Sequence, residues 1–274
     1  MPRICIPHQG LSVSDSADDS DMDLFVSVLD LPESAENLEF LYQSIEKSTL
    51  ASVGTLTIVR GARIPIIKYI DSGGSGIQVD ISMNNGSATA STTFIQHHLS
   101  LFPPLRPLTM VLKQWLFQRK MNEVYTRGGL SSYALFLLVL AIVHRHRFER
   151  IYPAEELVGR YLFQFLDQWS EPTAFSEIIR PLKSSLEKSD IHCGELYHPF
   201  SLCMDVFDLL IVGIQDPVNE QNYIGNQTFS IREIQQEWRL SMNALTVAIE
   251  EYTNDINNGR KSSLLGSIVG LTTR

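Results

Sequence analysis

The chain has 274 residues, 44% of them hydrophobic and 19% charged, and its net charge at neutral pH is −9. These fractions are ordinary for a globular protein and exclude a wholly disordered chain. The three cysteines give no disulfide framework. The longest apolar run, 133–143, is shorter than the roughly 20 residues of a membrane span. Because no basic-then-apolar signal segment opens the chain, we expect a soluble protein.

The acidic balance also limits how the protein could bind nucleic acid. A chain of net charge −9 does not attract a phosphate backbone over its whole surface. Any RNA or DNA would have to be held in a local basic groove, through metal ions, or by a partner protein.

The first ninety or so residues are predicted to form an α/β unit. A strand pattern occupies 21–28, helical spacing occupies 36–48, and β-rich runs follow at 53–61 and 63–70. A glycine-rich turn then leads into 77–82, where apolar and polar residues alternate as in a half-buried strand.

From about residue 91 onward the pattern becomes helical. One apolar stripe runs along 106–120, and 131–147 is apolar nearly all round, which predicts a helix at the centre of this half. A further helix is predicted to begin at Ser230, because Ser230 and Glu233 have the spacing of a capping box.

Two aspartates on alternate residues stand at the start of the first predicted strand. Asp21 and Asp23 project to the same face, while Met22 is expected to point into the core. Asp80 lies on the polar face of 77–82 and joins the pair if the two strands are neighbours. Three converging carboxylates repel one another unless hard cations such as Mg²⁺ neutralise them. The spacing alone leaves open that Asp21 and Asp23 end a solvated acidic loop.

The order of several motifs resembles that of the DNA-polymerase-β-like nucleotidyltransferases. The motifs are SDMDLFV, ARIPIIKYI, IQVDIS, the long stretch around LKQWLFQRKMNEVYT…GGLSSY, and IQDPVNEQN. Within this group the chain is most similar to the Trf-type poly(A) polymerases of nuclear RNA surveillance. The resemblance implies an α+β fold: a polymerase-β-like catalytic domain over 1–96, incomplete at its N-terminus, and a mostly helical PAP-associated nucleotide-recognition domain over 97–274.

The same resemblance implies roles for individual residues. Asp21, Asp23 and Asp80 match catalytic aspartates that bind two Mg²⁺ or Mn²⁺ ions. The nucleotide-binding positions are Asn85 for the ribose, Lys113 for the triphosphate, Ser132 for a phosphate, Tyr133 for base stacking, and Asp216 and Asn222 in the base-recognition loop. Asn222 stands where uridine-preferring relatives carry histidine, which favours ATP. Taken alone, the same stretches are also typical of a turn at Asn85, a helix cap at GGLSSY and an Asp-Pro turn.

The sequence departs from the family pattern at several points. The Gly-Ser pair that holds phosphates upstream of the first aspartate has no counterpart, which predicts either an N-terminally truncated gene product or a weakened phosphate grip. Arg127 is an extra residue before the double glycine, and Asn226 replaces a basic residue.

Three functions are therefore compatible with the sequence. The first is a template-independent RNA 3′-terminal adenylyltransferase that tags nuclear RNAs for exosomal decay. The second is a catalytically impaired nucleotidyltransferase-like binding or scaffold protein, and the third is a terminal uridylyltransferase. For the first, the resemblance implies ATP and an RNA 3′ end as substrates. It also implies a nuclear TRAMP-type complex with an RNA-binding zinc-knuckle protein and an RNA helicase.

Overall fold

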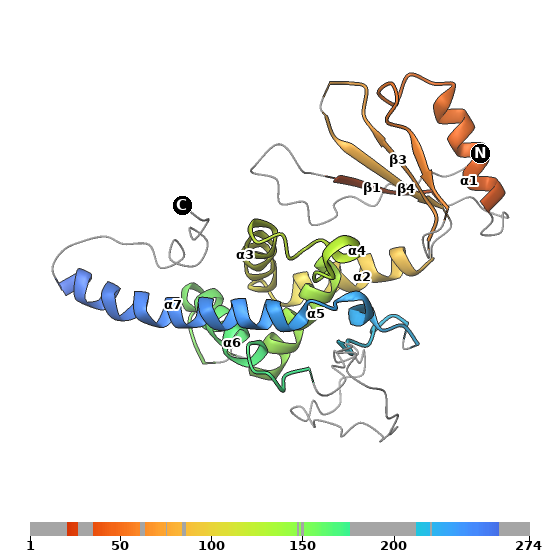
Figure 1. Ribbon diagram of the computed structural model, residues 1–274. Helices are drawn as coiled ribbons and strands as arrows, with labels where there is room; N and C mark the ends of the chain where they lie inside the picture. Colours follow the sequence, from red (N-terminus) through yellow and green to blue (C-terminus); the bar gives the residue numbers. More distant parts are fainter. Residues whose placement is uncertain are drawn as a thin grey trace. The chain divides into compact units, whose positions relative to one another are not determined.

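The computed structural model describes a large part of the chain as two compact units (Figure 1). The described residues are 21–26, 35–60, 64–74, 76–83, 86–146, 148, 151–175, 212–219 and 221–257. The units are Met1–His97 and His98–Arg274. Their assignment as a catalytic and a nucleotide-recognition domain stays a prediction.

A mixed four-stranded sheet forms the first unit. Its strands are β1 (Asp21–Val26), β2 (Thr57–Val59), β3 (Ile66–Ile70) and β4 (Gln78–Met83). They lie in the order β1-β4-β3-β2, with β1 and β4 parallel and the other two pairs antiparallel. The strand through SDMDLFV and the strand through IQVDIS are therefore neighbours, as the clustering of their aspartates required.

Helix α1 (Ala35–Glu46) covers one face of this sheet. The buried core beneath it consists of Leu38, Ile45, Ile67, Tyr69, Val79 and Ile81. The alternation expected for β4 is confirmed, because Val79 and Ile81 are buried whereas Gln78, Asp80 and Ser82 are only partly buried. The face opposite α1 consequently carries the polar residues of the central strands.

The side chain of Met22 is not buried in the core, although the alternation of β1 predicts that it should be. The side chain is 46% exposed, so the expectation that it points into the core is wrong. Among the described strands, β1 lies at the edge of the sheet beside β4, and α1 packs against β3 and β4. Leu24 and Val26, farther along β1, do reach the core cluster, whereas Met22 stands at the beginning of the strand.

Helices make up most of the described part of the second unit. They are α2 (Gly86–Leu101), which crosses the boundary between the units, α3 (Leu105–Gln118), α4 (Val124–Arg127), α5 (Ser132–His146), α6 (Ala154–Trp169), the 3₁₀ turn η2 (Ile224–Gln227) and α7 (Ile231–Asn257). Helix α5 contacts α3, α6 and η2, and its residues 134–140 are all buried. The prediction that the all-apolar helix forms the centre of this half is confirmed.

The long helix α7 packs along α6 (Figure 1). At the contact, the ring of Trp238 lies 5.1 Å from that of Phe165 and 6.4 Å from that of Trp115. The indole N–H of Trp115 donates a 3.0 Å hydrogen bond to the hydroxyl of Ser241. Aromatic packing around Trp238, together with the hydrogen bond of Trp115 to Ser241, therefore fixes α7 against the core of the unit.

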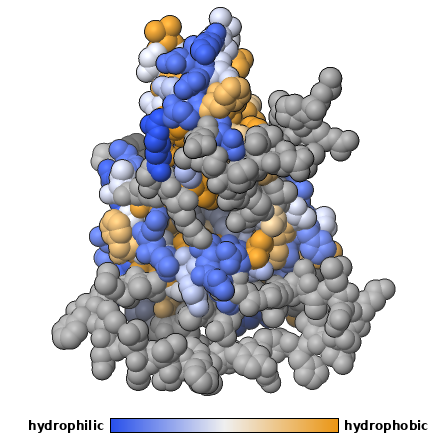
Figure 2. All heavy atoms as spheres, turned by 90° about the vertical axis from the view of Figure 1, so that its right-hand side faces the viewer, coloured by the Kyte–Doolittle hydropathy of each residue, from blue (hydrophilic) through white to orange (hydrophobic). Residues whose placement is uncertain are grey.

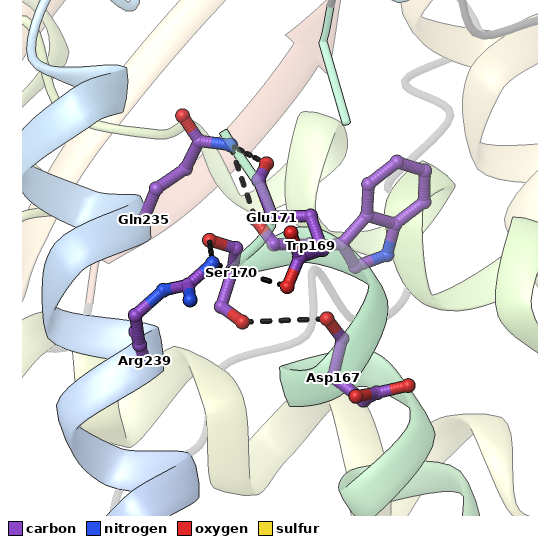
Figure 3. Close-up of polar contacts among 6 residues, drawn as sticks. All are labelled: Asp167, Trp169, Ser170, Glu171, Gln235 and Arg239. Atoms are coloured by element: carbon purple, nitrogen blue, oxygen red, sulfur yellow. Dashed lines mark hydrogen bonds and ion pairs between the residues drawn. The ribbon is translucent and has the colours of Figure 1, made fainter. Parts of the chain in front are cut away.

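Side chains of α7 also cap the end of α6, as Figure 3 shows. The amide nitrogen of Gln235 donates to the carbonyl oxygens of Trp169 (3.3 Å) and Glu171 (2.6 Å). The guanidinium of Arg239 donates to the carbonyl of Ser170 at 3.0 Å and to the carboxylate of Glu171 at 3.1 Å. These bonds satisfy carbonyl groups that a helix end leaves without intrahelical partners.

The predicted start of α7 at Ser230 is confirmed, although the serine hydroxyl has a different partner from the one expected. It donates a 2.6 Å hydrogen bond to the carbonyl of Arg127, and the Ser230 backbone N–H donates to the carbonyl of Gly128 at 3.1 Å. Ser230 therefore ties the first turn of α7 to the end of α4.

The described surface mixes polar and apolar residues. On the face that Figure 2 shows, hydrophilic residues are interspersed with hydrophobic ones. The exposed large apolar side chains include Leu240 and Val247 of α7, each 53% exposed. Single exposed apolar residues of this kind are ordinary for folded proteins. None of the helices in the described part of the chain is long and apolar enough to cross a membrane.

Candidate nucleotide and metal site

Three charged residues form a row across the polar face of the sheet in the first unit. The register of β1 and β4 pairs Asp23 with Asp80, and the register of β3 and β4 pairs Lys68 with the same Asp80. Side chains of residues paired across neighbouring strands project to the same face, about 5 Å apart. The row Asp23–Asp80–Lys68 therefore crosses three adjacent strands. Asp21 is paired with Gln78, two residues earlier along both strands.

The carboxylate of Asp80 is held by two donors. The ammonium of Lys68 lies 2.5 Å from Oδ2, and the amide nitrogen of Gln78 lies 3.4 Å from Oδ1. The Asp80 side chain is only 14% exposed. Its orientation is therefore set by the neighbouring strand and by its own strand, whereas Asp23 stands on the exposed edge strand.

The donor set of this face suits a hard cation. Carboxylate oxygens on adjacent strands are the ligands that Mg²⁺ and Mn²⁺ prefer. Among the described residues, no group of three histidine, cysteine or acidic side chains could hold a metal ion. The side chain of Asp21 and all of Asn85 lie outside the described residues. Two of the three expected ligands, Asp23 and Asp80, are thus register partners on one face of the sheet, and metal binding by all three aspartates stays a prediction.

In the second unit, Asp216 joins two of the expected nucleotide-binding residues. The hydroxyl of Tyr133 donates to Oδ1 of Asp216 at 3.2 Å, and the amide nitrogen of Asn222 donates to Oδ2 at 3.0 Å. The backbone N–H of Val218 adds a third bond, also 3.0 Å, to Oδ1. Asp216 itself is 4% exposed. A buried carboxylate is stable here because several donors surround it.

The loop that carries Asp216 and Asn222 closes as a small hairpin. The backbone N–H of Asp216 donates to the carbonyl of Asn222 at 2.9 Å, and that of Ile224 donates to the carbonyl of Ile214 at the same distance. Gly225 ends the hairpin with no room for a side chain, because a Cβ there would lie 2.2 Å from the carbonyl oxygen of Val212. The segment is more than an Asp-Pro turn, since its Asp216 accepts a hydrogen bond from Tyr133 and a second one from Asn222 of the same loop.

The double glycine before α5 has a structural function. Gly128 adopts a left-handed conformation (φ 63°) that caps α4, and its N–H donates to the carbonyl of Val124. A Cβ on Gly129 would lie 2.3 Å from the carbonyl oxygen of Met121. The chain can therefore turn closely from α4 into α5 only with glycines at these positions.

The GGLSSY segment was expected to supply a helix cap and a phosphate contact, and these two functions fall on different serines, Ser131 and Ser132. The hydroxyl of Ser131 accepts a 3.1 Å hydrogen bond from the N–H of Ala134, so Ser131 is the residue that caps α5. Ser132 begins the helix and is exposed. An exposed hydroxyl in the first turn of a helix is compatible with the predicted phosphate contact. Lys113 lies on α3 and is partly buried, and its contact with the triphosphate stays a prediction.

Gly129→Ala tests this account of the double glycine. The new Cβ meets backbone rather than a flexible side chain, so we expect the free energy of unfolding to fall by about 2 kcal/mol, with weaker nucleotide binding through displacement of Tyr133. Chemical denaturation measures the first effect and calorimetry with Mg·ATP the second. Gly159→Ala on α6 is the matched control, because a Cβ there meets nothing within 4 Å. Equal stability of the two variants would contradict the account.

A cavity of about 260 Å³ at the start of α7 has a lining rich in basic residues. The charged residues of its lining are Arg119, Lys120, Arg127 and Glu233. Arg119 pairs with Glu237 at 3.3 Å, and Arg127 pairs with Glu123 at 3.2 Å. Three carboxylates thus offset three cations, and this cavity does not supply the local basic surface that an acidic chain needs for RNA.

The fold places the chain in a known structural class. Residues 12–100 match the family model of the central palm domain of the mitochondrial-like poly(A) RNA polymerase. The polymerase core of TRAMP, an RNA surveillance complex, resembles the chain with a TM-score of 0.67 and 26% identity, over 91% of this chain and 76% of that one. The Cid1 poly(U) polymerase with magnesium and 3′-dATP has a TM-score of 0.61 at 20% identity, over 83% and 77%, a likeness of fold alone. The fold is that of a polymerase-β-like nucleotidyltransferase.

Curated relatives narrow this class. Poly(A) RNA polymerase protein 2 of Saccharomyces cerevisiae is 29% identical over 258 residues, which cover 91% of this chain and 42% of that protein. The inactive non-canonical poly(A) RNA polymerase protein Trf4-2 of Drosophila melanogaster is also 29% identical, over 74% of this chain and 49% of that protein. The chain spans less than half the length of these relatives. It is related in sequence and fold to the Trf-type poly(A) RNA polymerases, which confirms the resemblance of its motifs.

Lys68 and Gln78 were not among the residues that the motifs singled out. Both lie in recognised motif segments, and the sequence did carry a signal for Lys68, a lone charge within the apolar run IPIIKYI. That signal could not identify a partner, because the partner depends on the register between strands.

Proposed function

We propose that the chain is a template-independent RNA 3′-terminal adenylyltransferase, which transfers AMP from ATP to the end of an RNA. The single observation that carries the proposal is the register of β1 and β4, which aligns Asp23 with Asp80 on one face of the sheet. The alternative interpretation of Asp21 and Asp23 was a solvated acidic loop. Such a loop would not be expected to form a parallel strand pair in which Asp23 lies opposite Asp80.

In this proposal the two units supply different parts of the chemistry. Asp21, Asp23 and Asp80 hold the divalent ions, and Tyr133, Asp216 and Asn222 recognise the base. The RNA 3′-hydroxyl oxygen gives up its proton to water and bonds to the α-phosphorus of ATP, as the bond to pyrophosphate breaks and pyrophosphate leaves. A divalent ion held by these aspartates would supply Lewis-acid chemistry, favouring the ionised form of the attacking hydroxyl and the charge of the departing pyrophosphate. Lys113 and Ser132 neutralise and hydrogen-bond the phosphate oxygens.

The hydrogen bonds of Asn222 support ATP as the nucleotide. Because a carboxylate only accepts, the amide nitrogen of Asn222 faces Asp216 and its carbonyl oxygen is directed away. A carbonyl oxygen accepts from the exocyclic amino group of adenine, whereas uracil offers a carbonyl oxygen at the corresponding edge. Two acceptors facing each other repel, so this orientation discriminates against UTP.

The activity can be tested directly. The purified chain is incubated with Mg²⁺, a short RNA and each nucleoside triphosphate in turn, and extension of the RNA is followed on a denaturing gel. We expect extension with ATP in preference to UTP. Extension with UTP alone would establish the uridylyltransferase alternative. No extension together with measurable Mg·ATP binding would show that another subunit is required, and no Mg·ATP binding at all would favour a non-catalytic scaffold.

Asn222→His tests the base-recognition function separately from catalysis. A histidine beside the Asp216 carboxylate is favoured in its doubly protonated form, so that one N–H can face Asp216 and the other can donate to uracil. We expect the ratio of ATP to UTP incorporation to fall by about tenfold, equivalent to about 1.4 kcal/mol. Competition between the two labelled nucleotides measures the ratio. An unchanged ratio would remove Asn222 from base recognition.

One observation favours the scaffold alternative. The inactive Trf4-2 protein of Drosophila melanogaster is as similar in sequence to this chain as the yeast poly(A) RNA polymerase protein 2 is, at 29% identity. The acidic charge and the neutralised cavity near α7 favour a requirement for partners in either case. We propose that an RNA-binding zinc-knuckle protein and an RNA helicase supply the RNA-holding surface in a nuclear TRAMP-type assembly, which tags RNAs for exosomal decay. Co-purification of RNA with the chain alone, at physiological salt, would contradict this dependence.

A further inference from the structure

We propose that Lys68 is a built-in counter-ion of the metal site: it stabilises Asp80 when no divalent ion is bound and weakens the binding of that ion. The inference rests on the proposed function, because it concerns the carboxylates that would hold the metal. It adds a residue to which the motifs assigned no role.

The row of charges explains why such a counter-ion is needed. Asp23 and Asp80 are register partners on adjacent strands, so their like charges repel across the sheet. Lys68 lies on the other side of Asp80, with its ammonium 2.5 Å from the carboxylate. The negative charge of Asp80, at the centre of the row, is therefore balanced by Lys68 from β3 even when no metal ion is bound.

The burial of this pair distinguishes it from an ordinary surface ion pair. The side chains of Asp80 and Lys68 are 14% and 35% exposed, whereas in the ion pairs of Arg160 with Glu156 and of Arg239 with Glu171 each partner is more than 40% exposed. Charges shielded from water interact more strongly. Removal of Lys68 should therefore be felt by Asp80 rather than screened away.

The same positive charge must also oppose a divalent ion. A metal bound to the Asp80 carboxylate would stand within a few ångströms of the Lys68 ammonium, and the two cations repel each other. Lys68 thus favours the metal-free state, so that ion binding depends on the additional charge of the nucleotide phosphates. Without Lys68 the site should bind a divalent ion more tightly and depend on it for stability.

Lys68→Met provides the test, with thermal melting and Mn²⁺ titration as readouts. In EDTA we expect the melting temperature to fall by about 5 °C relative to the parent chain, and millimolar Mg²⁺ to restore most of the loss. The dissociation constant for Mn²⁺, measured by electron paramagnetic resonance without nucleotide, should fall by about tenfold. The parent chain should show a much smaller effect of Mg²⁺ on melting.

Matched variants separate charge from packing. Lys68→Arg keeps the charge and should melt like the parent chain in EDTA. Lys47→Met removes an exposed lysine from the same unit and should change neither readout. In the double variant Lys68→Met with Asp80→Asn, the repulsion is gone, so the Mg²⁺-dependent gain in melting temperature should disappear.

The outcomes distinguish this inference from the proposed function. If the parent chain binds Mn²⁺ and Lys68→Met melts and binds as Lys47→Met does, the counter-ion function is overturned and the metal site stands. If neither the parent chain nor Lys68→Met binds Mn²⁺, the metal site itself fails. Should Lys68→Met not fold, the double variant is expected to fold, and its failure to do so would also overturn the inference.

Discussion

Asp80→Asn is expected to lower the rate of ATP-dependent RNA extension by roughly a thousandfold, since a bound metal ion contributes several kcal/mol of charge stabilisation in the transition state. The amide keeps the size of the side chain but loses the negative charge that a divalent ion requires. Its oxygen can still accept a hydrogen bond from Lys68, and the repulsion from Asp23 disappears. The relief of that repulsion offsets the loss of the ion pair with Lys68, so the change in the free energy of unfolding should stay within about 1 kcal/mol.

Extension assays and thermal melting check the two halves of this prediction. Asp71→Asn is the matched control in the same unit, because it makes the same chemical change outside the charged row. The Asp71 carboxylate accepts from the N–H of Gly73 at 3.0 Å, a bond that an asparagine can also make. Asp71→Asn should extend RNA at the parent rate. An Asp80→Asn variant that remains as active as this control would remove Asp80 from catalysis.

Asp216→Ala is expected to have the second largest effect, in the other unit. The change removes the acceptor shared by the Tyr133 hydroxyl, the Asn222 amide and the Val218 N–H. Because hydrogen bonds to a charged group contribute more than neutral ones, the free energy of unfolding should fall by about 3 kcal/mol. Loss of the shared anchor should also raise the dissociation constant for Mg·ATP by about tenfold or more.

Denaturant unfolding and calorimetry with Mg·ATP measure these two quantities. Asp167→Ala on α6 removes the same carboxylate from an exposed position, where the amide of Gln164 donates to it at 3.4 Å. That control should change stability by less than about 0.5 kcal/mol. Nucleotide binding unaffected by Asp216→Ala would separate the hairpin from base recognition and leave it a structural feature.

The elements of the fold were largely predictable because their signals are local. The alternation in IQVDIS defines a half-buried strand, and the apolar run of 131–147 defines a buried helix, whatever their partners are. Met22 was mispredicted for the complementary reason. Alternation says which face a residue shares, but the depth of burial depends on how many strands and helices flank that position, and β1 lies at the sheet edge.

The candidate site was predictable only in part. Motif resemblance singled out Tyr133, Asp216 and Asn222 individually, and the capping signal of Ser131 was assigned to the GGLSSY segment as a whole. Their mutual hydrogen bonds could not be derived in this way, because Tyr133 and Asp216 are 83 residues apart in the chain. Tyr133, Asp216 and Asn222 are brought together by their side-chain rotamers and by the closure of the 214–224 hairpin. Neither feature produces a periodic pattern in the sequence that could have been recognised.

The sequence by itself determined the α+β class, the positions of the four strands and of helices α1, α3, α5 and α7, and the relationship to the Trf-type polymerases, since these follow from short-range periodicity and motif order. Only the tertiary structure decided the register of β1, β4 and β3, and with it the row Asp23–Asp80–Lys68. A strand specifies its two faces through its own alternation, but the residue that lies opposite depends on pairing with a distant segment. The charge balance of the site is a property of that pairing.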